Sequence, residues 1–335
     1  MSTLTNEHPF AQYVRILGKG KTGSRSLSRE QARTAFAMIL AGQARPEQIG
    51  AFLMLLRVKE ESAEELAGFV EAARDLIQAP DDITVDIDWS SYAGKRQQLP
   101  WFIACLLLLA DHGYRVLVHG ARGHTEGRLY CEDAFVALGL PVARNWHDVA
   151  AQLDSERLSF LPIDALCPPL QQLIDMRSLF GLRSPVHTLC RLLNPLSAPY
   201  SLQSVFHPAY ADSHQQAAAL LGQANMAVFK GEGGEIERKP GADCLVKSLV
   251  EHSPGQEKWP RLDHGRSDDE AQLDSRLLAA VWNRQQPHAY ADDAVPGTLA
   301  VVLKLIKPQL DQPSALAEAR QMWQQRRPRH FTAGA

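Results

Sequence analysis

The chain has 335 residues, of which 45% are hydrophobic and 22% charged, so it can bury an extensive core and is not expected to be disordered. Its 35 Lys and Arg residues against 38 Asp and Glu residues give a formal net charge of −3, which argues against a protein coated in positive charge. The longest apolar run, 101–110, is shorter than the roughly 20 residues that a membrane helix needs. Since the first residues also lack the pattern of an export signal, we expect a cytoplasmic protein with no membrane contact.

The first eighty residues predict helices. Ser28 and Gln31 form a capping box before an apolar-periodic run, and Ser62 and Glu65 form a second one before a helix that ends near Pro80. Pro46 opens the helix between them, which is apolar on more than one face. A helix of that kind must bury two sides, so we expect the second side to meet another subunit in a homodimer.

From residue 84 onward, short apolar strands alternate with helices, which indicates a mostly parallel sheet with helices on its faces. A loop rich in Pro, Gly and charge, 253–267, is expected to be mobile, and three helices follow from about residue 268. The expected strands are 84–87, 115–119, 158–163, 202–206, 225–230, 235–239 and 243–249, and the expected helices are 100–112, 132–138 and 168–193.

Three segments resemble the anthranilate phosphoribosyltransferases of glycosyltransferase family 3. Residues 27–68 resemble the N-terminal helical domain of that family. Val118-His119-Gly120-Ala121-Arg122 resembles its Lys-His-Gly-Asn-Arg motif, and the run from Arg177 through Gly181-Leu182-Arg183 to Asn194-Pro195 resembles its Arg-x-x-x-Gly-x-Arg-Thr…Asn-Pro segment. The resemblance implies an α/β protein with a small all-helical dimerisation domain, 1–80 plus 166–195, and a larger α/β domain with a mostly parallel central sheet, 81–165 plus 196–335.

The segments that hold phosphoribosyl pyrophosphate in that family are altered here. The family's Gly-Thr-Gly-Gly-Asp loop falls on Ser90-Ser91-Tyr92-Ala93-Gly94, and its Asn-Ile-Ser-Thr stretch falls on Pro100-Trp101-Phe102-Ile103. Each lost charge-assisted contact is worth roughly 1.5–3 kcal/mol. The acidic pair that holds magnesium in the family aligns near Glu235, with Glu237 one place displaced, so we assign no metal or other cofactor unless transferase activity remains. We therefore expect transfer to anthranilate to be lost.

The predicted cleft keeps cations in place of the lost phosphate contacts. Its walls are expected to include Ser90, Ser91, Tyr92, Gly94, His119 and Gly120, at the carboxyl ends of two parallel strands where an open α/β sheet binds its ligand. Lys95, Arg96, Arg122, Arg177 and Arg183 are expected to face it. One residue pattern of the chain resembles the YbiB-type paralogues of the transferase, which implies binding of nucleic acid with low sequence specificity. The pattern includes Tyr92, Gly94, Arg96, Gln98, His119-Gly120, Cys167-Pro168-Pro169 and the stretch from Arg183 to His187-Thr188-Leu189.

A second group of cations lies in the Gly- and Ser-rich segment near the N-terminus. Lys19, Lys21, Arg25 and Arg29 precede or open a helix, with Glu30 as the single acid between residues 15 and 33. Such residues can contact several phosphates of DNA or RNA without reading sequence. The alternative for this segment is a solvated surface of scattered cations.

The sequence therefore leaves two functions open. The first is a homodimer that has lost phosphoribosyl transfer and binds DNA or RNA through phosphate contacts. The second is a divergent glycosyl or phosphoribosyl transferase that acts on another anionic substrate in the inter-domain cleft, with Glu235 or Glu237 as a remaining magnesium ligand.

Overall fold

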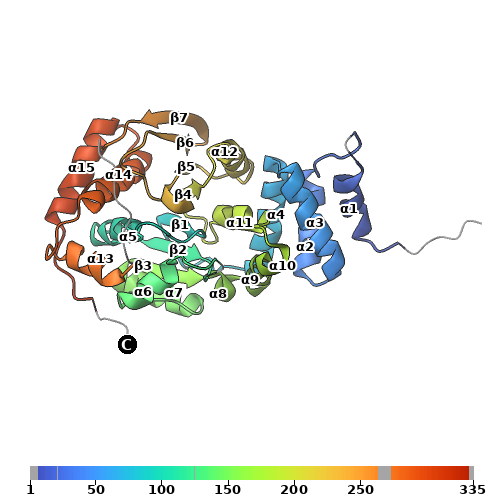
Figure 1. The fold of residues 1–335 in the computed structure, drawn as a ribbon, viewed down its shortest axis with the longest axis horizontal. Coiled ribbons are helices and arrows are strands. Elements are labelled where there is room, and N and C mark those ends of the chain that lie inside the picture. The colour runs from blue at the N-terminus through green and yellow to red at the C-terminus, as the bar shows by residue number, and fades with distance from the viewer. Residues whose placement is uncertain (1–6, 21, 124, 263–272, 332–335) are drawn as a thin grey trace, which may run out of the picture.

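The computed structural model describes residues 7–20, 22–123, 125–262 and 273–331. Four helices form one end of the molecule and a sheet flanked by helices forms the other (Figure 1). Both capping boxes are confirmed, because Ser28 accepts from the backbone N–H of Gln31 and Ser62 from that of Glu65. The four helices are α1 (Ala11–Gly18), α2 (Arg29–Leu40), α3 (Pro46–Lys59) and α4 (Ala63–Ile77).

The central sheet has seven strands in the order β3-β2-β1-β4-β5-β6-β7. The first five run parallel, and the last two pair antiparallel at one edge. The mostly parallel α/β fold with an N-terminal helical domain is thus confirmed. The strands are β1 (Ile87–Ser91), β2 (Val116–Gly120), β3 (Leu158–Pro162), β4 (Tyr200–Val205), β5 (Asn225–Lys230), β6 (Cys244–Val250) and β7 (Ser253–Trp259).

Helices cover both faces of this sheet. The most apolar of them, α5 (Phe102–Asp111), is buried along nearly its whole length against α14 (Ala289–Ile306). None of the helices in the described ranges is long and apolar enough to cross a membrane. The remaining helices are α6 (Cys131–Ala137), α7 (Trp146–Glu156), α8 (Ile163–Leu166), α9 (Pro168–Asp175), α10 (Arg177–Phe180), α11 (Val186–Leu189), α12 (Tyr210–Leu220), α13 (Ser275–Trp282) and α15 (Gln312–Gln325), with 3-10 turns η1 (Cys190–Leu192) and η2 (Glu232–Gly234).

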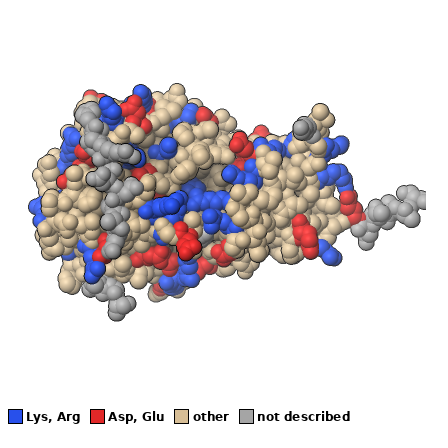
Figure 2. All heavy atoms as spheres, in the orientation of Figure 1, with Lys and Arg blue, Asp and Glu red and all other residues tan. Residues whose placement is uncertain are grey.

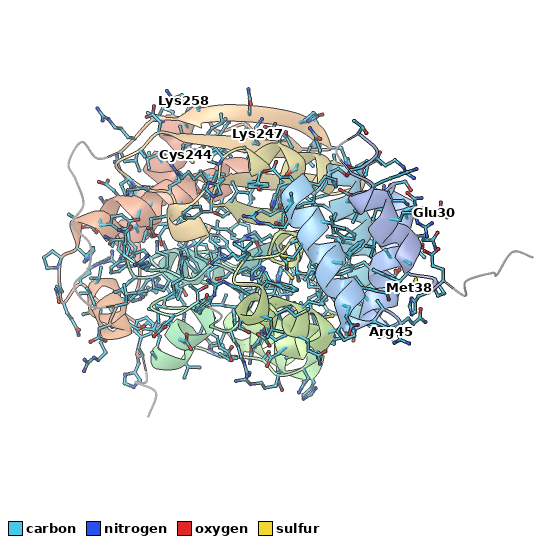
Figure 3. The ribbon with its side chains drawn as sticks, turned by 45° about the vertical axis from the view of Figure 1, so that its right-hand side comes forward. Glu30, Met38, Arg45, Cys244, Lys247 and Lys258 are labelled. Carbon is cyan, nitrogen blue, oxygen red and sulfur yellow. The ribbon has the colours of Figure 1, made fainter. Side chains whose placement is uncertain are left out.

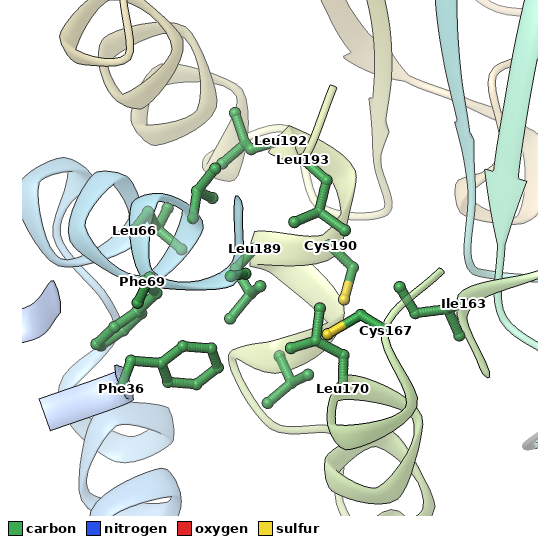
Figure 4. Packing of buried hydrophobic residues seen from close by; sticks show 14 of the residues in the cluster. Phe36, Leu66, Phe69, Ile163, Cys167, Leu170, Leu189, Cys190, Leu192 and Leu193 are labelled. Atoms are coloured by element: carbon green, nitrogen blue, oxygen red, sulfur yellow. The ribbon is translucent and has the colours of Figure 1, made fainter. Parts of the chain in front are cut away.

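One apolar core joins the N-terminal helices to the segment after β3. Phe36 of α2 and Phe69 of α4 lie in the same cluster as Leu170 of α9 and Leu189 of α11 (Figure 4). Glu30, Met38 and Arg45 lie along the outer side of this helical part of the molecule, and Lys247 and Lys258 lie on the antiparallel edge strands of the sheet (Figure 3). The boundaries expected for the two domains stay a prediction.

Three predicted elements were wrong. The strand expected at 84–87 begins at Ile87 and continues to Ser91, because pairing with β2 extends through the predicted cleft residues. No strand forms at 235–239, because the carboxylates there bond to the loop after β1 instead of lying beside a strand. The loop expected from 253 is β7 as far as Trp259, paired with β6, and residues 263–267 lie outside the described ranges.

Candidate anion-binding site

The predicted cleft residues lie where β1 and β2 end. Ser90 and Ser91 close β1, and His119 and Gly120 close β2 in register with them. A Cβ at Gly120 would lie 2.3 Å from the carbonyl oxygen of Ser91, so only glycine permits this approach of the two strands. Gly94 has φ +69° in the loop that follows β1, and the loop turns there beside the ring of Tyr130.

The aromatic residues of this cleft are buried beneath its surface. The Tyr92 hydroxyl lies 2.6 Å from Nδ1 of His119, and Nε2 of His119 lies 3.2 Å from a carboxylate oxygen of Asp88. Burial, with a smaller contribution from Cys190, raises the pKa of Tyr92 well above its usual value. Tyr92 and His119 therefore support the loop from below, and neither side chain offers an exposed wall to a ligand.

The loop after β1 holds a carboxylate of the protein itself. Oε1 of Glu235 accepts hydrogen bonds from the backbone N–H groups of Ala93, at 2.6 Å, and Gly94, at 2.7 Å. By the resemblance noted in the sequence, these N–H groups belong to the loop expected to correspond to the pyrophosphate-binding loop of the transferases. Because Glu235 is only 1% exposed, its carboxylate satisfies both donors from within the protein. An external phosphate at these donors would have to displace it.

A second internal carboxylate sits at the start of α5. Glu237 accepts from the backbone N–H of Phe102 at 2.9 Å and from the Tyr290 hydroxyl at 3.0 Å. It also pairs with the ammonium of Lys95 at 2.6 Å, and Glu232 is the second partner of that ammonium. Burial raises the pKa of Glu237 to about 7, partly offset by the charge of Lys95.

Lys95 is accordingly not available to a ligand. Its side chain is fully buried between two carboxylates, and their charges outweigh desolvation and raise its pKa. The expectation that Lys95 contacts nucleic-acid phosphates is wrong, because the sequence alone did not reveal the internal acids that neutralise it.

Magnesium does not fit the residues that were considered for it. The Glu235 carboxylate already accepts hydrogen bonds from two backbone N–H groups. The ammonium of Lys95 lies beside the Glu237 carboxylate, where a magnesium ion would have to bind. Within the described ranges there is no group of three or more His, Cys, Asp or Glu side chains placed to hold a metal ion. We therefore derive no step through magnesium in this protein.

Four arginines gather beside this filled loop, and we call them the arginine cluster: Arg128, Arg177, Arg183 and Arg191. Burial, with smaller contributions from the neighbouring guanidinium groups, lowers the pKa of Arg183 to about 10. Arg128 donates to the carbonyl oxygens of Ala93 and Gly94 at 3.1 and 2.9 Å, and Arg191 donates to that of His187 at 2.7 Å. Neither these two nor Arg183 forms an ion pair with a carboxylate of a described residue. Such a cluster favours a bound anion.

The positive charge continues into a depression of about 620 Å³, which we call the cationic hollow. Two walls come from the loop after β1 and from the ends of β5 and η2. Its acids are already compensated, since Glu232 pairs with Lys95 and Asp243 pairs with Lys258 at 2.8 Å. Figure 2 shows Lys and Arg side chains gathered in the middle of this face of the molecule. The cations that line the hollow are Arg96, Arg128, Lys230 and Lys239.

The other predicted cations are dispersed or paired. Arg29 forms a two-pronged ion pair with Glu71, and Arg122 pairs with Glu132 and Asp164. Lys19 and Arg25 are exposed beside α1, at the end of the molecule away from the sheet. Lys21 lies outside the described residues. The structure therefore brings Arg96, Arg177 and Arg183 to the same face and leaves the N-terminal group apart.

Sequence reasoning missed several members of the site. Arg191, Lys230 and Lys239 were not singled out. Arg191 lies inside the segment that runs from Arg177 to Asn194-Pro195, but no local pattern in the sequence shows that its charge lies near that of Arg183. Lys230 ends β5 beside β4, so the rule that ligands bind at the carboxyl ends of parallel strands would have found it.

The comparisons with known proteins agree with this architecture. Residues 11–77 match the family described as the glycosyl transferase family, helical bundle domain. Solved structures show the same fold over nearly the whole chain. The anthranilate phosphoribosyltransferase of Saccharomyces cerevisiae in complex with PRPP and Mg has a TM-score of 0.77 at 16% identity, covering 95% of this chain and 94% of that one. The enzyme from Thermus thermophilus has a TM-score of 0.74 at 20% identity, covering 93% and 94%.

Two relatives define the family more closely. The chain is 30% identical over 278 residues to the Escherichia coli (strain K12) protein named uncharacterized protein YbiB, covering 82% of this chain and 86% of that protein. It is also 30% identical over 272 residues to the anthranilate phosphoribosyltransferase of Anaeromyxobacter sp. (strain Fw109-5), covering 78% and 80%. The chain belongs to the family that contains the anthranilate phosphoribosyltransferases and YbiB.

Proposed function

We propose that this protein is a cytoplasmic homodimer that binds DNA or RNA through phosphate contacts with little sequence preference, and that it no longer transfers phosphoribosyl groups. One observation carries the proposal: Arg128, Arg183 and the exposed cations Arg96, Lys230 and Lys239 pair with no described carboxylate, and they lie beside a loop whose N–H groups are already filled by the protein's own Glu235.

The charge arrangement suits a polyanion better than a single small phosphate. The cluster and the hollow share Arg128, and together they include Arg96, Arg183 and Lys239. Guanidinium and ammonium groups spread over such a surface contact phosphates at several points along a backbone. None of these contacts distinguishes one base from another, so the proposed binding has low specificity.

The loss of phosphoribosyl transfer follows from the donors that are no longer free. The resemblance of the sequence implies that the loop after β1 and the start of α5 correspond to the segments that hold pyrophosphate in the transferases. Here, Glu235 takes the loop N–H groups and Glu237 takes the N–H of Phe102. A pyrophosphate would have to displace two buried carboxylates that carry the same sign of charge.

The homodimer is proposed from the outer face of α3. Met54 is only partly buried there, and Val58, one turn further along the same face, is 86% exposed. A second copy of the chain would cover this apolar surface and double the number of cationic sites on one particle.

Fluorescence anisotropy of labelled random-sequence oligonucleotides, single- and double-stranded, tests the proposal. About four to six phosphate contacts predict a slope of roughly −3.6 to −5.4 for log K against log salt on duplex DNA. The variants Arg96→Gln and Arg183→Gln should each flatten the slope by about 1. Arg276→Gln removes an exposed charge from α13, away from the site, and serves as the matched control.

The transferase alternative predicts a different outcome. A protein that binds no oligonucleotide at low salt, but that is stabilised against heat by phosphoribosyl pyrophosphate only when magnesium is present, would contradict the nucleic-acid proposal and favour the enzyme.

A further inference from the structure

An exposed aromatic ring stands at the edge of the cationic hollow. Phe206 directly follows β4 and is 49% exposed, and it lines the hollow together with Arg96 and Lys230. It is the single aromatic ring among the exposed large hydrophobic side chains of the described residues. Cys244, at the start of β6, also lines the hollow and is labelled in Figure 3.

The ring of Phe206 is held in position by its neighbours. The His207 ring lies 4.9 Å from it, centroid to centroid, at an interplanar angle of 83°. On another side, a Cβ at Gly234 would lie 3.6 Å from Cβ and 3.7 Å from Cδ2 of Phe206, so the end of η2 packs close to this side chain. An exposed ring that is already fixed loses little conformational entropy when a flat partner stacks on it.

Three exposed cations line the same hollow as the ring of Phe206. Lys230, Lys239 and Arg96 are all exposed, and none has an ion pair with a described carboxylate. An aromatic face beside free cations is the combination with which proteins hold unpaired nucleotides, because every base has a face that stacks and every nucleotide brings a phosphate.

We propose that the cationic hollow takes one unpaired nucleotide of a bound strand, with its base stacked on Phe206 and its flanking phosphates on Arg96, Lys230 and Lys239. The inference rests on the proposed nucleic-acid function and adds a base contact to it. Since stacking does not depend on base identity, it leaves the low sequence specificity unchanged.

The test separates base contacts from phosphate contacts. Anisotropy is measured with three ligands of equal phosphate number: an oligothymidylate strand, an abasic strand and a duplex. Wild-type protein should bind oligothymidylate about fivefold or more tightly than the abasic strand. Phe206→Ala should abolish that difference, while its affinity for the duplex and the abasic strand stays unchanged.

Two further variants distinguish stacking from a structural role of the side chain. Phe206→Trp should keep the preference, and Phe206→Leu, which retains the apolar bulk without an aromatic face, should lose it. Equal binding of the base-bearing and abasic strands by wild-type protein, with no effect of Phe206→Ala, would overturn this inference while leaving the proposed function intact. Failure to bind all three ligands at low salt would overturn both.

Discussion

Replacing Glu235 by alanine probes the internal carboxylate that fills the phosphate loop. The change removes the acceptor of two short hydrogen bonds from the N–H groups of Ala93 and Gly94. Hydrogen bonds to a charged group contribute roughly 1.5–3 kcal/mol each, so Glu235→Ala should lower the free energy of unfolding by about 3–6 kcal/mol. Glu235→Gln keeps an acceptor but loses the charge, and should cost about half as much.

Urea unfolding followed by tryptophan fluorescence measures this loss, because the buried Trp89 and Trp101 lie on either side of the loop in sequence. The exposed Glu126 provides the control, and Glu126→Ala should change stability by less than about 0.5 kcal/mol. Pyrophosphate should then stabilise the Glu235→Ala protein more than the wild type, since it can reach the vacated N–H groups. A Glu235→Ala protein as stable as the wild type, with no added response to pyrophosphate, would refute the idea that this carboxylate occupies an anion site.

Three further outcomes follow from the structure. Burial, with a contribution from Arg191, lowers the pKa of His214 to about 3, so His214 makes the unfolded chain bind more protons and costs stability as pH drops below 6.5. Glu237, with its pKa raised to about 7, acts in the opposite direction over the same range, so the test is the difference between the two proteins: from pH 7.5 to 5.5, the wild type should lose about 1.4 kcal/mol relative to His214→Gln in urea unfolding. Gly120→Ala should destabilise the fold by at least roughly 1–3 kcal/mol in the same assay, because its Cβ would meet the Ser91 carbonyl, and an unchanged midpoint would contradict this. Arg29→Gln should leave oligonucleotide affinity nearly unchanged, because Glu71 already neutralises Arg29, and a loss as large as that of Arg183→Gln would show the N-terminal segment to be part of the site.

The fold was predictable from local signals. The capping boxes at Ser28 and Ser62, and the alternation of short strands with helices, are properties of neighbouring residues that the sequence displays directly. The start of β1 was misplaced because its partners, β2 and β4, are far away in sequence, and their pairing decides where the strand begins and ends.

The site was harder to predict because charge depends on pairing. Lys95 and Arg96 are adjacent in sequence, yet one is fully buried between carboxylates and the other is exposed. The acids that neutralise Lys95 are Glu232 and Glu237, which lie more than a hundred positions further along the chain. No local sequence pattern indicates that contact. Glu235 was aligned with a metal-binding acid, but its role depends on two backbone N–H groups that only the folded loop brings to it.

The central claim is that, in this chain, a surface that binds a nucleic-acid backbone has replaced the site that binds one pyrophosphate. The most direct test is a pair of calorimetric titrations of the same protein preparation, one with a random-sequence oligonucleotide and one with phosphoribosyl pyrophosphate plus magnesium. We predict salt-sensitive binding of the oligonucleotide and no magnesium-dependent binding of phosphoribosyl pyrophosphate. Magnesium-dependent saturation by phosphoribosyl pyrophosphate, with no heat from the oligonucleotide at low salt, would contradict the claim.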